Sequence, residues 1–303
     1  MHRFQVSLFA SSVVFAVTIL QGVYPVTPGE RTSKNDTRLK TILERFPSAD
    51  TNEDGVLTLQ EALDFRQQKN RAKKKGERPP TYSKHYKRYE HKSKNGKVLV
   101  YYVMQPEKYD PHKNYPLVLA LHGRGGSTQA ATTLGTPAMR KKYPCFVLAP
   151  TSPKTATWGI PQGFREKLRS KEQKLGLVFE VMEKLPKKWS IDAKRIYVTG
   201  QSMGGFGTFA AIAKRPGLFA AAVPICGGWD PTEAKNMVKI PLWAFHGAQD
   251  KTVPPKLSRD MIAAIKKAGG SPKYTEYPNV GHGSWGRAYA TPEMWEWMFE
   301  QKK

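Results

Sequence analysis

Cysteine and acidic residues are both scarce in this chain of 303 residues. Its two cysteines cannot form a disulfide framework, and no cluster of cysteine and histidine has the spacing of a zinc site. Only 25 acidic residues oppose 49 lysines and arginines, which gives a formal net charge of +24. The 39% hydrophobic content is too high for a wholly disordered chain. The composition therefore predicts a globular protein with a positive surface, whose partner could be nucleic acid, an anionic membrane or an acidic polysaccharide.

The N-terminus has the features of an export signal. His2 and Arg3 precede an apolar run from Phe4 to Leu20, and no charged residue follows until Glu30. We expect residues 1–29 to be a signal peptide, or an uncleaved signal anchor because no small-x-small cleavage triplet follows the run. The protein would then be secreted or periplasmic, and it would contact a membrane only through an uncleaved anchor.

Residues 36–67 have the pattern of a single EF-hand. A short amphipathic helix ends at Pro47, the twelve-residue loop 50–61 follows, and a second helix begins after it. Gly55 takes the sixth loop position, where the chain turns sharply, and oxygen donors alternate around it as Ca²⁺ requires. The predicted calcium ligands are Asp50, Asn52, Asp54, the Val56 carbonyl, Thr58 and Glu61.

The alternative to a calcium site is an acidic turn that binds no ion. The segment resembles the single EF-hand units found near the N-termini of some secreted bacterial hydrolases. EF-hands usually work in pairs, and the sequence contains no second loop of this pattern. A structural role for calcium is therefore favoured over a signalling role.

Residues 68–86 are predicted to be an exposed basic linker. Thirteen lysines and arginines but only two acidic residues lie between residues 66 and 97, and Gly76 and the Pro79-Pro80 pair oppose a helix. The segment is either a solvated spacer extended by its own repulsion or a contact for acidic polysaccharide. Nothing in it reads a base or a sugar, and no nucleic acid partner is expected because an exported hydrolase would meet acidic polysaccharide first.

Residues 87–303 alternate between apolar runs and helical stretches, which predicts an α/β domain with a mostly parallel twisted sheet flanked by helices. In the strand order that is usual for such a fold, the strands of Cys145 and Cys226 are about three positions apart, so we expect two free buried thiols. A helix is predicted over 175–185. The predicted strands are 87–92, 98–104, 117–121, 145–149, 196–199, 221–225, 242–245 and 273–277, and the first two form a hairpin through Asn95-Gly96.

Three of these strands end at residues that could work together. Ser202 lies in Gly-Gln-Ser-Met-Gly, between a strand and a helical stretch, which is the setting of a nucleophile elbow. Asp250 and His282 follow the ends of two later strands. The carboxyl ends of parallel strands meet at one edge of a sheet, so the order predicts a Ser-His-Asp triad. Asp230, which also follows a strand, is the alternative acid.

The predicted chemistry is acyl transfer. A serine hydroxyl is a poor nucleophile, so His282 would take its proton and return it to the leaving alcohol, while Asp250 orients the histidine. The tetrahedral oxyanion needs donors that are already in place, and we expect the backbone N–H groups of Met203 and Arg124 to supply them. No cofactor is expected for catalysis.

Several other residues near the predicted strand ends carry weaker signals. Trp158, Trp229 and Trp285 lie in predicted loops and could stack on sugar or aromatic acyl groups, although packing is the commoner fate of tryptophan. His122 and His246 are interpreted as structural residues, because each ends a buried strand and the acid signal lies four residues beyond His246.

The motifs around the triad resemble the α/β-hydrolase superfamily over about residues 87–303. Three stretches, 197–207, 223–228 and 245–254, look like those of secreted bacterial esterases related to feruloyl and acetylxylan esterases, polyhydroxybutyrate depolymerases and prolyl-oligopeptidase-like hydrolases. The resemblance implies a serine hydrolase without a catalytic metal that acts on carboxylic esters, with acylated carbohydrate as the favoured substrate class.

Other functions stay open on the sequence alone. A prolyl-oligopeptidase-like serine peptidase would use the same triad on an amide. A phospholipase or a carboxylesterase of broad specificity would use it on other esters. A nonenzymatic protein that binds polyanions would use only the basic charge.

Overall fold

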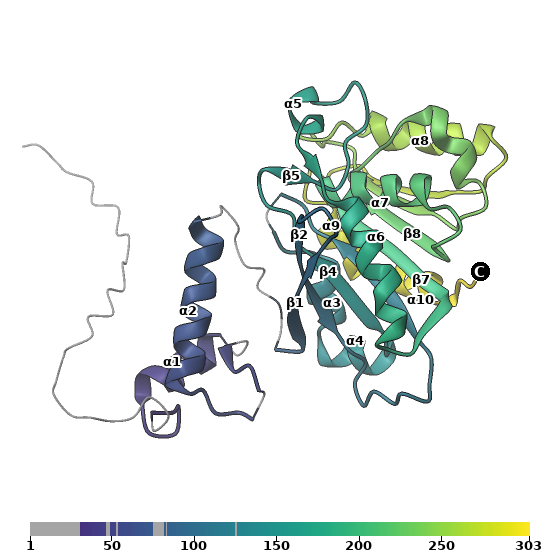
Figure 1. The fold of residues 1–303 in the computed structure, drawn as a ribbon. Helices are drawn as coiled ribbons and strands as arrows, with labels where there is room; N and C mark the ends of the chain where they lie inside the picture. Colours follow the sequence, from purple (N-terminus) through teal and green to yellow (C-terminus); the bar gives the residue numbers. More distant parts are fainter. Residues whose placement is uncertain (1–30, 47–48, 53, 75–81, 83, 125) are drawn as a thin grey trace, which may run out of the picture.

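The computed structural model describes residues 31–46, 49–52, 54–74, 82, 84–124 and 126–303 (Figure 1). The predicted signal segment and part of the predicted linker, residues 75–81 and 83, lie outside the described residues. Within the described ranges, no helix has both the length and the apolar character needed to cross a membrane.

The N-terminal part of the described chain is a pair of helices around the predicted calcium loop. Helix α1 spans Thr37–Arg45 and α2 spans Leu59–Lys74. The carboxylate of Asp36 accepts the first free N–H groups of α1, as expected of a capping residue. A small core of Leu39, Ala49 and Leu57 is buried between the two helices and the loop, as the helical spacing of the apolar residues predicts.

Helix α2 continues further than the sequence indicated. The predicted linker began at residue 68, but the helix runs to Lys74, so the first part of that segment is helical. The physical reason is local: no glycine or proline occurs between Gly55 and Gly76, and lysine and arginine are good helix formers that also favour the C-terminal end of the helix dipole. The boundary predicted at residue 68 was therefore wrong.

An eight-stranded sheet forms the centre of the C-terminal part, with the strand order β1-β2-β4-β3-β7-β8-β9-β10. Strand β2 is antiparallel to both neighbours, and the pairs from β4 to β10 are parallel, which confirms the predicted hairpin and mostly parallel sheet. The strands are β1 (Tyr86–Lys92), β2 (Val98–Met104), β3 (Tyr115–Leu121), β4 (Phe146–Pro150), β7 (Ile191–Gln201), β8 (Ala221–Ile225), β9 (Trp243–Gly247) and β10 (Lys273–Tyr277).

Helices cover both faces of this sheet (Figure 1). Successive side chains of β3 alternate between two cores, as the period of a strand requires: Leu117, Leu119 and Leu121 pack into one, and Val118 and Ala120 into the other. The first core takes apolar residues from α6 (Leu175–Lys184), α7 (Met203–Lys214) and α8 (Lys256–Lys267), and the second from α3 (Gln129–Leu134), α9 (Trp285–Ala290) and α10 (Pro292–Glu300).

Shorter elements complete the domain. Two-residue strands β5 (Ala156–Thr157) and β6 (Glu172–Gln173) pair outside the main sheet. The remaining short helices are α4 (Pro137–Lys142), α5 (Glu166–Arg169), η2 (Leu185–Lys187) and η3 (Pro231–Met237).

Both cysteines are free and buried, as predicted. Cys145 directly precedes β4, and Cys226 directly follows β8. Strands β3 and β7 lie between β4 and β8 in the sheet, so the two thiols are beyond the reach of a disulfide.

Candidate active site

Ser202 occupies the sharp turn between β7 and α7. Its backbone has φ 56° and ψ −116°, a conformation that residues other than glycine rarely adopt. A Cβ atom on Gly200 would overlap the carbonyl of Gly204, and one on Gly204 would overlap the carbonyl of Leu121. The glycines on either side of the serine are therefore required by the close approach of the backbone, as in a nucleophile elbow.

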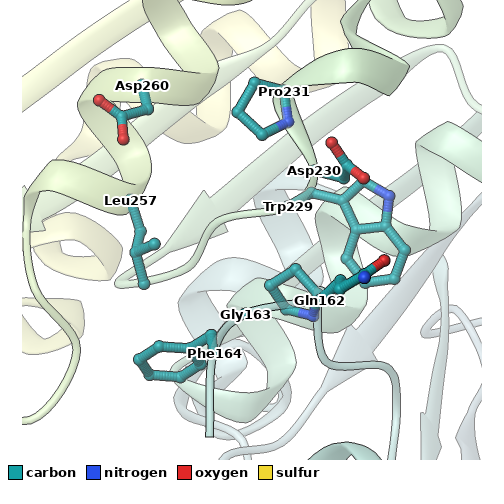
Figure 2. Close-up of a pocket in the computed structure, with 9 residues that line it drawn as sticks. Gln162, Gly163, Phe164, Trp229, Asp230, Pro231, Leu257 and Asp260 are labelled. Atoms are coloured by element: carbon teal, nitrogen blue, oxygen red, sulfur yellow. The ribbon is translucent and has the colours of Figure 1, made fainter. Parts of the chain in front are cut away.

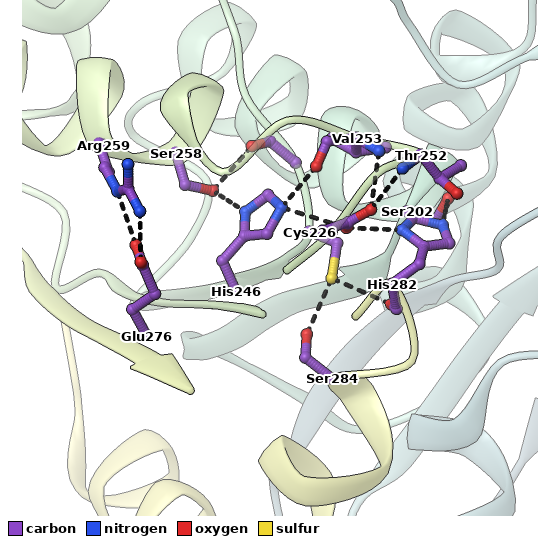
Figure 3. A network of polar contacts seen from close by, with 12 residues as sticks. Ser202, Cys226, His246, Thr252, Val253, Ser258, Arg259, Glu276, His282 and Ser284 are labelled. Carbon is purple, nitrogen blue, oxygen red and sulfur yellow. Dashed lines mark hydrogen bonds and ion pairs between the residues drawn. The ribbon is translucent and has the colours of Figure 1, made fainter. Parts of the chain in front are cut away.

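The turn brings the hydroxyl of Ser202 to two residues that follow other strands. His282 Nε2 lies 2.9 Å from Ser202 Oγ, and His282 Nδ1 lies 2.7 Å from Asp250 Oδ2 (Figure 3). The imidazole is 23% exposed, whereas the Asp250 side chain is completely buried. Asp230 instead caps the short helix η3 through Thr232. The three predicted residues thus form one hydrogen-bonded chain at the carboxyl edge of the sheet.

Asp250 is held by several donors. Its Oδ1 accepts the backbone N–H groups of Thr252 and Val253, at 2.8 and 2.9 Å. Burial raises the pKa of this carboxyl, but the hydrogen bonds from His282, Val253 and Thr252 outweigh that effect and hold the pKa below its ordinary value. The group is therefore a carboxylate at neutral pH, and it favours the His282 tautomer whose Nδ1 carries the proton and whose Nε2 can accept one.

The two predicted oxyanion donors lie on segments next to Ser202. Met203 is the first residue of α7, where an N–H group has no partner within the helix. Arg124 follows Gly123, whose ideal Cβ position lies 3.6 Å from Ser202 Cβ. Both residues therefore lie on backbone next to the nucleophile, and their role as oxyanion donors stays a prediction.

His122 holds the loop that carries Arg124. It is almost fully buried, its Nδ1–H donates to the Gly123 carbonyl, and its Nε2 accepts the N–H of Ser152 at 2.8 Å. The indole of Trp158 donates to the His122 carbonyl at 2.9 Å. Burial lowers the pKa of His122 to about 4, so the ring is neutral at pH 7. These contacts support its interpretation as a structural residue.

His122 should make the protein less stable in mild acid. In the unfolded chain it titrates near 6.5 and in the folded chain near 4, so protons bind preferentially to the unfolded state as the pH falls through this window. We expect this residue alone to lower the free energy of unfolding by about 2 kcal/mol between pH 7.5 and pH 5. Urea unfolding of the wild type and of His122→Asn at both pH values measures the difference. Equal pH dependence in the two proteins would contradict the prediction.

The three tryptophans predicted to face substrate have different environments. Trp158 is fully buried and its indole N–H is already bonded to the protein, so the prediction that it contacts substrate is wrong. Trp285 packs edge-on against the His282 ring, with centroids 5.1 Å apart. Trp229 lines a cavity of about 310 Å³ together with Phe164 and Asp230 (Figure 2). Packing decides whether the side chain of a loop tryptophan turns into the core or lines a cavity, and the local sequence does not contain that information.

The sequence analysis did not predict that polar residues gather behind the triad. His246 and Cys226 are both fully buried and lie, with Asp250, at the ends of β8 and β9. The Cys226 thiol is 3.3 Å from the His282 carbonyl and 2.8 Å from Ser284 Oγ. Burial raises the pKa of this thiol to about 12, so it remains protonated. The only local signal was the short spacing between His246 and Asp250.

Comparisons with known proteins agree with this geometry. Residues 160–293, which include all three residues of the hydrogen-bonded chain, match the dienelactone hydrolase family. Poly(3-hydroxyalkanoate) depolymerase C of Paucimonas lemoignei is 34% identical over 125 residues, covering 38% of this chain and 28% of that protein. A bifunctional acetylxylan esterase/xylanase of Neocallimastix patriciarum is 27% identical over 164 residues, covering 53% of this chain and 23% of that protein. The chain thus spans less than a third of either relative.

Solved structures give the same fold. A thermostable esterase superposes with a TM-score of 0.67 at 36% identity, covering 72% of this chain and 64% of that one. The acylaminoacyl peptidase of Pyrococcus horikoshii superposes with a TM-score of 0.55 at 18% identity, covering 70% of this chain and 41% of that one, which shows a shared fold. The described chain from Tyr86 to Lys303 therefore has the α/β-hydrolase fold, and its residues 160–293 match the dienelactone hydrolase family.

Proposed function

We propose that this protein is an exported esterase that removes acyl groups from polysaccharide through Ser202, His282 and Asp250. The observation that carries the proposal is the hydrogen-bonded chain from Ser202 Oγ through the His282 ring to Asp250 Oδ2. In that chain His282 Nε2 can take the serine proton as Oγ attacks the ester carbonyl, and the imidazolium that forms faces the carboxylate. The proton then passes to the leaving alcohol, and water releases the acyl group by the same route.

The substrate class is supported by the cavity that Trp229 lines. Its walls are residues 161–164, residues 229–231, which come after β8, and Leu257 and Asp260 of α8, the helix that follows the Asp250 loop. It combines the aromatic rings of Trp229 and Phe164 with the carboxylates of Asp230 and Asp260. Aromatic faces and hydrogen-bond acceptors together suit the alternating C–H and O–H surface of a sugar. One relative that aligns over half of this chain is named an acetylxylan esterase.

A panel of esters tests the substrate class. We expect the highest kcat/KM on acetylated xylan or feruloylated sugars, lower values on short nitrophenyl esters and none on peptides. Polyhydroxybutyrate belongs in the panel because a depolymerase of poly(3-hydroxyalkanoate) is also similar to this chain. Faster turnover of polyhydroxybutyrate or of nitrophenyl esters than of every acylated sugar would contradict the proposed substrate, and cleavage of peptides would favour a peptidase.

The predicted export signal and the positive charge support a place of action outside the cell. Residues 1–29 have the signal pattern, and the basic stretch after α2 could hold an exported enzyme to acidic polysaccharide outside the cell. We propose this location and contact from the sequence, since the signal segment and part of the basic linker lie outside the described residues.

We also propose that the N-terminal part binds one calcium ion in a structural role, and the residues present fit that ion. The side chain of Glu61 reaches back across the loop, so that Oε1 accepts the N–H of Thr51 and Oε2 that of Thr58. Asp50 Oδ2 accepts the N–H of Gly55, whose φ of +80° provides the turn. Hard carboxylate oxygens at both ends of one tight loop are the donors that Ca²⁺ prefers.

Residues just before α1 pair with the short strand of the calcium loop, as a second EF-hand would. A lone loop leaves the edge of its short strand unpaired. Here Ser33 donates its N–H to the Leu57 carbonyl at 2.8 Å, and Leu59 donates to the Arg31 carbonyl at 2.9 Å. These bonds form an antiparallel bridge between Thr32 and Thr58. The loop is thus supported within one chain, which favours calcium binding by the monomer.

Calcium binding should depend on Glu61. We expect the wild type to bind one Ca²⁺ in isothermal titration, and Glu61→Gln to weaken binding at least about 10-fold because a bidentate carboxylate becomes a neutral amide. Asp64→Asn is the matched control, since Asp64 is an exposed acid one turn further along α2 and outside the loop. Absence of binding to the wild type, or equal affinity in the two variants, would rule out the proposed site.

A further inference from the structure

His246 is a fully buried histidine at the end of β9, next to the proposed catalytic acid. Both ring nitrogens have partners: Nδ1 lies 2.8 Å from Ser258 Oγ, and Nε2 lies 2.9 Å from the Val253 carbonyl oxygen (Figure 3). A carbonyl oxygen can only accept a hydrogen bond. The chemistry of the contact therefore places a proton on Nε2.

The same nitrogen also faces the carboxylate. His246 Nε2 is 3.3 Å from Asp250 Oδ2, the oxygen that accepts the Nδ1–H of His282. Burial lowers the pKa of His246 and outweighs the opposite effects of Val253 and Asp250, so the ring is neutral at pH 7. A neutral ring offers a single N–H, which donates to the Val253 carbonyl while the same nitrogen lies beside the Asp250 carboxylate.

The network around His246 connects three elements. Asp250 Oδ1 accepts the N–H of Val253, so the carboxylate is bonded to the backbone of the loop that follows β9. His246 binds the carbonyl of the same Val253 from behind. Ser258 on α8 fixes the ring, and its Oγ lies 2.8 Å from the carbonyl of Gly227, beyond the end of β8. The orientation of the carboxylate is therefore set by contacts from β9, α8 and the segment after β8.

We propose that His246 is a positioning residue for ester hydrolysis: it fixes the carboxylate of Asp250 in the orientation that receives the Nδ1–H of His282. The inference rests on the proposed function. His246 is fully buried and cannot touch a substrate, so it can act only through Asp250. A misplacement of about 1 Å in a catalytic group can cost about 100-fold in rate, so loss of the His246 contacts should lower the rate if the carboxylate of Asp250 shifts.

Two amide variants distinguish the roles of the two ring nitrogens of His246. The amide of His246→Asn reaches only the position of Nδ1, so it can keep the Ser258 contact but loses Val253 and Asp250. The longer side chain of His246→Gln can place an N–H near the position of Nε2. We expect kcat on a nitrophenyl ester to fall about 10- to 100-fold in His246→Asn with KM nearly unchanged, and to fall less than about 5-fold in His246→Gln. His112→Asn, at an exposed histidine, is the control and should equal the wild type.

A double-mutant cycle distinguishes positioning from general destabilisation. If His246 acts through Asp250, His246→Asn should lower kcat less than about 2-fold further when Asp250→Asn is already present. Full additivity of the two substitutions, or equal kcat in His246→Asn and His246→Gln, would overturn the inference. If the wild type hydrolyses no ester or Ser202→Ala stays active, the proposed function itself fails. A normal kcat in His246→Asn beside an inactive Ser202→Ala overturns only the role of His246.

Discussion

Replacing Ser202 by alanine should reduce ester turnover by about 10⁶-fold, the size of effect seen when the nucleophile of such a triad is removed. The loss is expected because His282 Nε2, 2.9 Å from Ser202 Oγ in the wild type, would then have no hydroxyl proton to take. Alanine removes only the oxygen and keeps the fold of the turn. The measurement is kcat on a nitrophenyl ester, with the thermal unfolding temperature recorded to show that the variant is folded.

The control for this experiment is Ser170→Ala. Ser170 is exposed and its hydroxyl donates to the Lys167 carbonyl, so we expect no change in kcat. Any residual rate in Ser202→Ala should come from the oxyanion donors and from substrate binding. A folded variant that keeps more than a hundredth of the wild-type rate would show that Ser202 is not the nucleophile.

Replacing Gly204 by alanine should destabilise the whole domain. The new Cβ would occupy the space of the Leu121 carbonyl oxygen, and neither β3 nor the start of α7 can move without disturbing its neighbours in the central sheet. We expect the free energy of unfolding to fall by about 3 kcal/mol, at the upper end of overpacking effects, with loss of activity as the turn shifts. Urea unfolding followed by circular dichroism measures the change.

Gly176→Ala is the matched control. Gly176 is the second residue of α6, it is exposed, and nothing lies within 4 Å of its ideal Cβ position. In an open helical position alanine is preferred to glycine, so we expect this variant to be more stable than the wild type by about 0.5 kcal/mol. The same chemical change should thus have opposite signs at the two positions. Similar stability of both variants would contradict the prediction, because it would mean that the turn at Ser202 can accommodate a Cβ atom on residue 204.

Most of the sheet could be predicted from the sequence because each strand carries a local signal. The runs at 98–104, 221–225 and 273–277 match strands β2, β8 and β10 at both ends. The central strands were predicted too short, since β3 begins at Tyr115 and β7 at Ile191. Those first residues join the sheet through pairing with each other across an irregular register, a contact between distant segments that no local pattern contains.

Two further errors have different causes. The end of α2 was placed too early because a run of positive charge resembles a linker, although no residue before Gly76 breaks a helix. Trp158 was placed in a loop, which is correct, but its indole turns inward to the carbonyl of His122. The direction of a large side chain depends on the space that other segments leave for it, and sequence spacing carries no information about that space.

The sequence by itself determined the alternation of strands and helices and placed a serine, an aspartate and a histidine after three strands, because parallel strands bring their carboxyl ends to one edge. Only the tertiary structure decided how these groups are held. Asp250 accepts three hydrogen bonds, two from its own loop and one from His282, and His246 Nε2 lies 3.3 Å from its Oδ2. Such contacts join residues from different strands at distances near 3 Å, and their geometry exists only once the sheet and its helices have packed together.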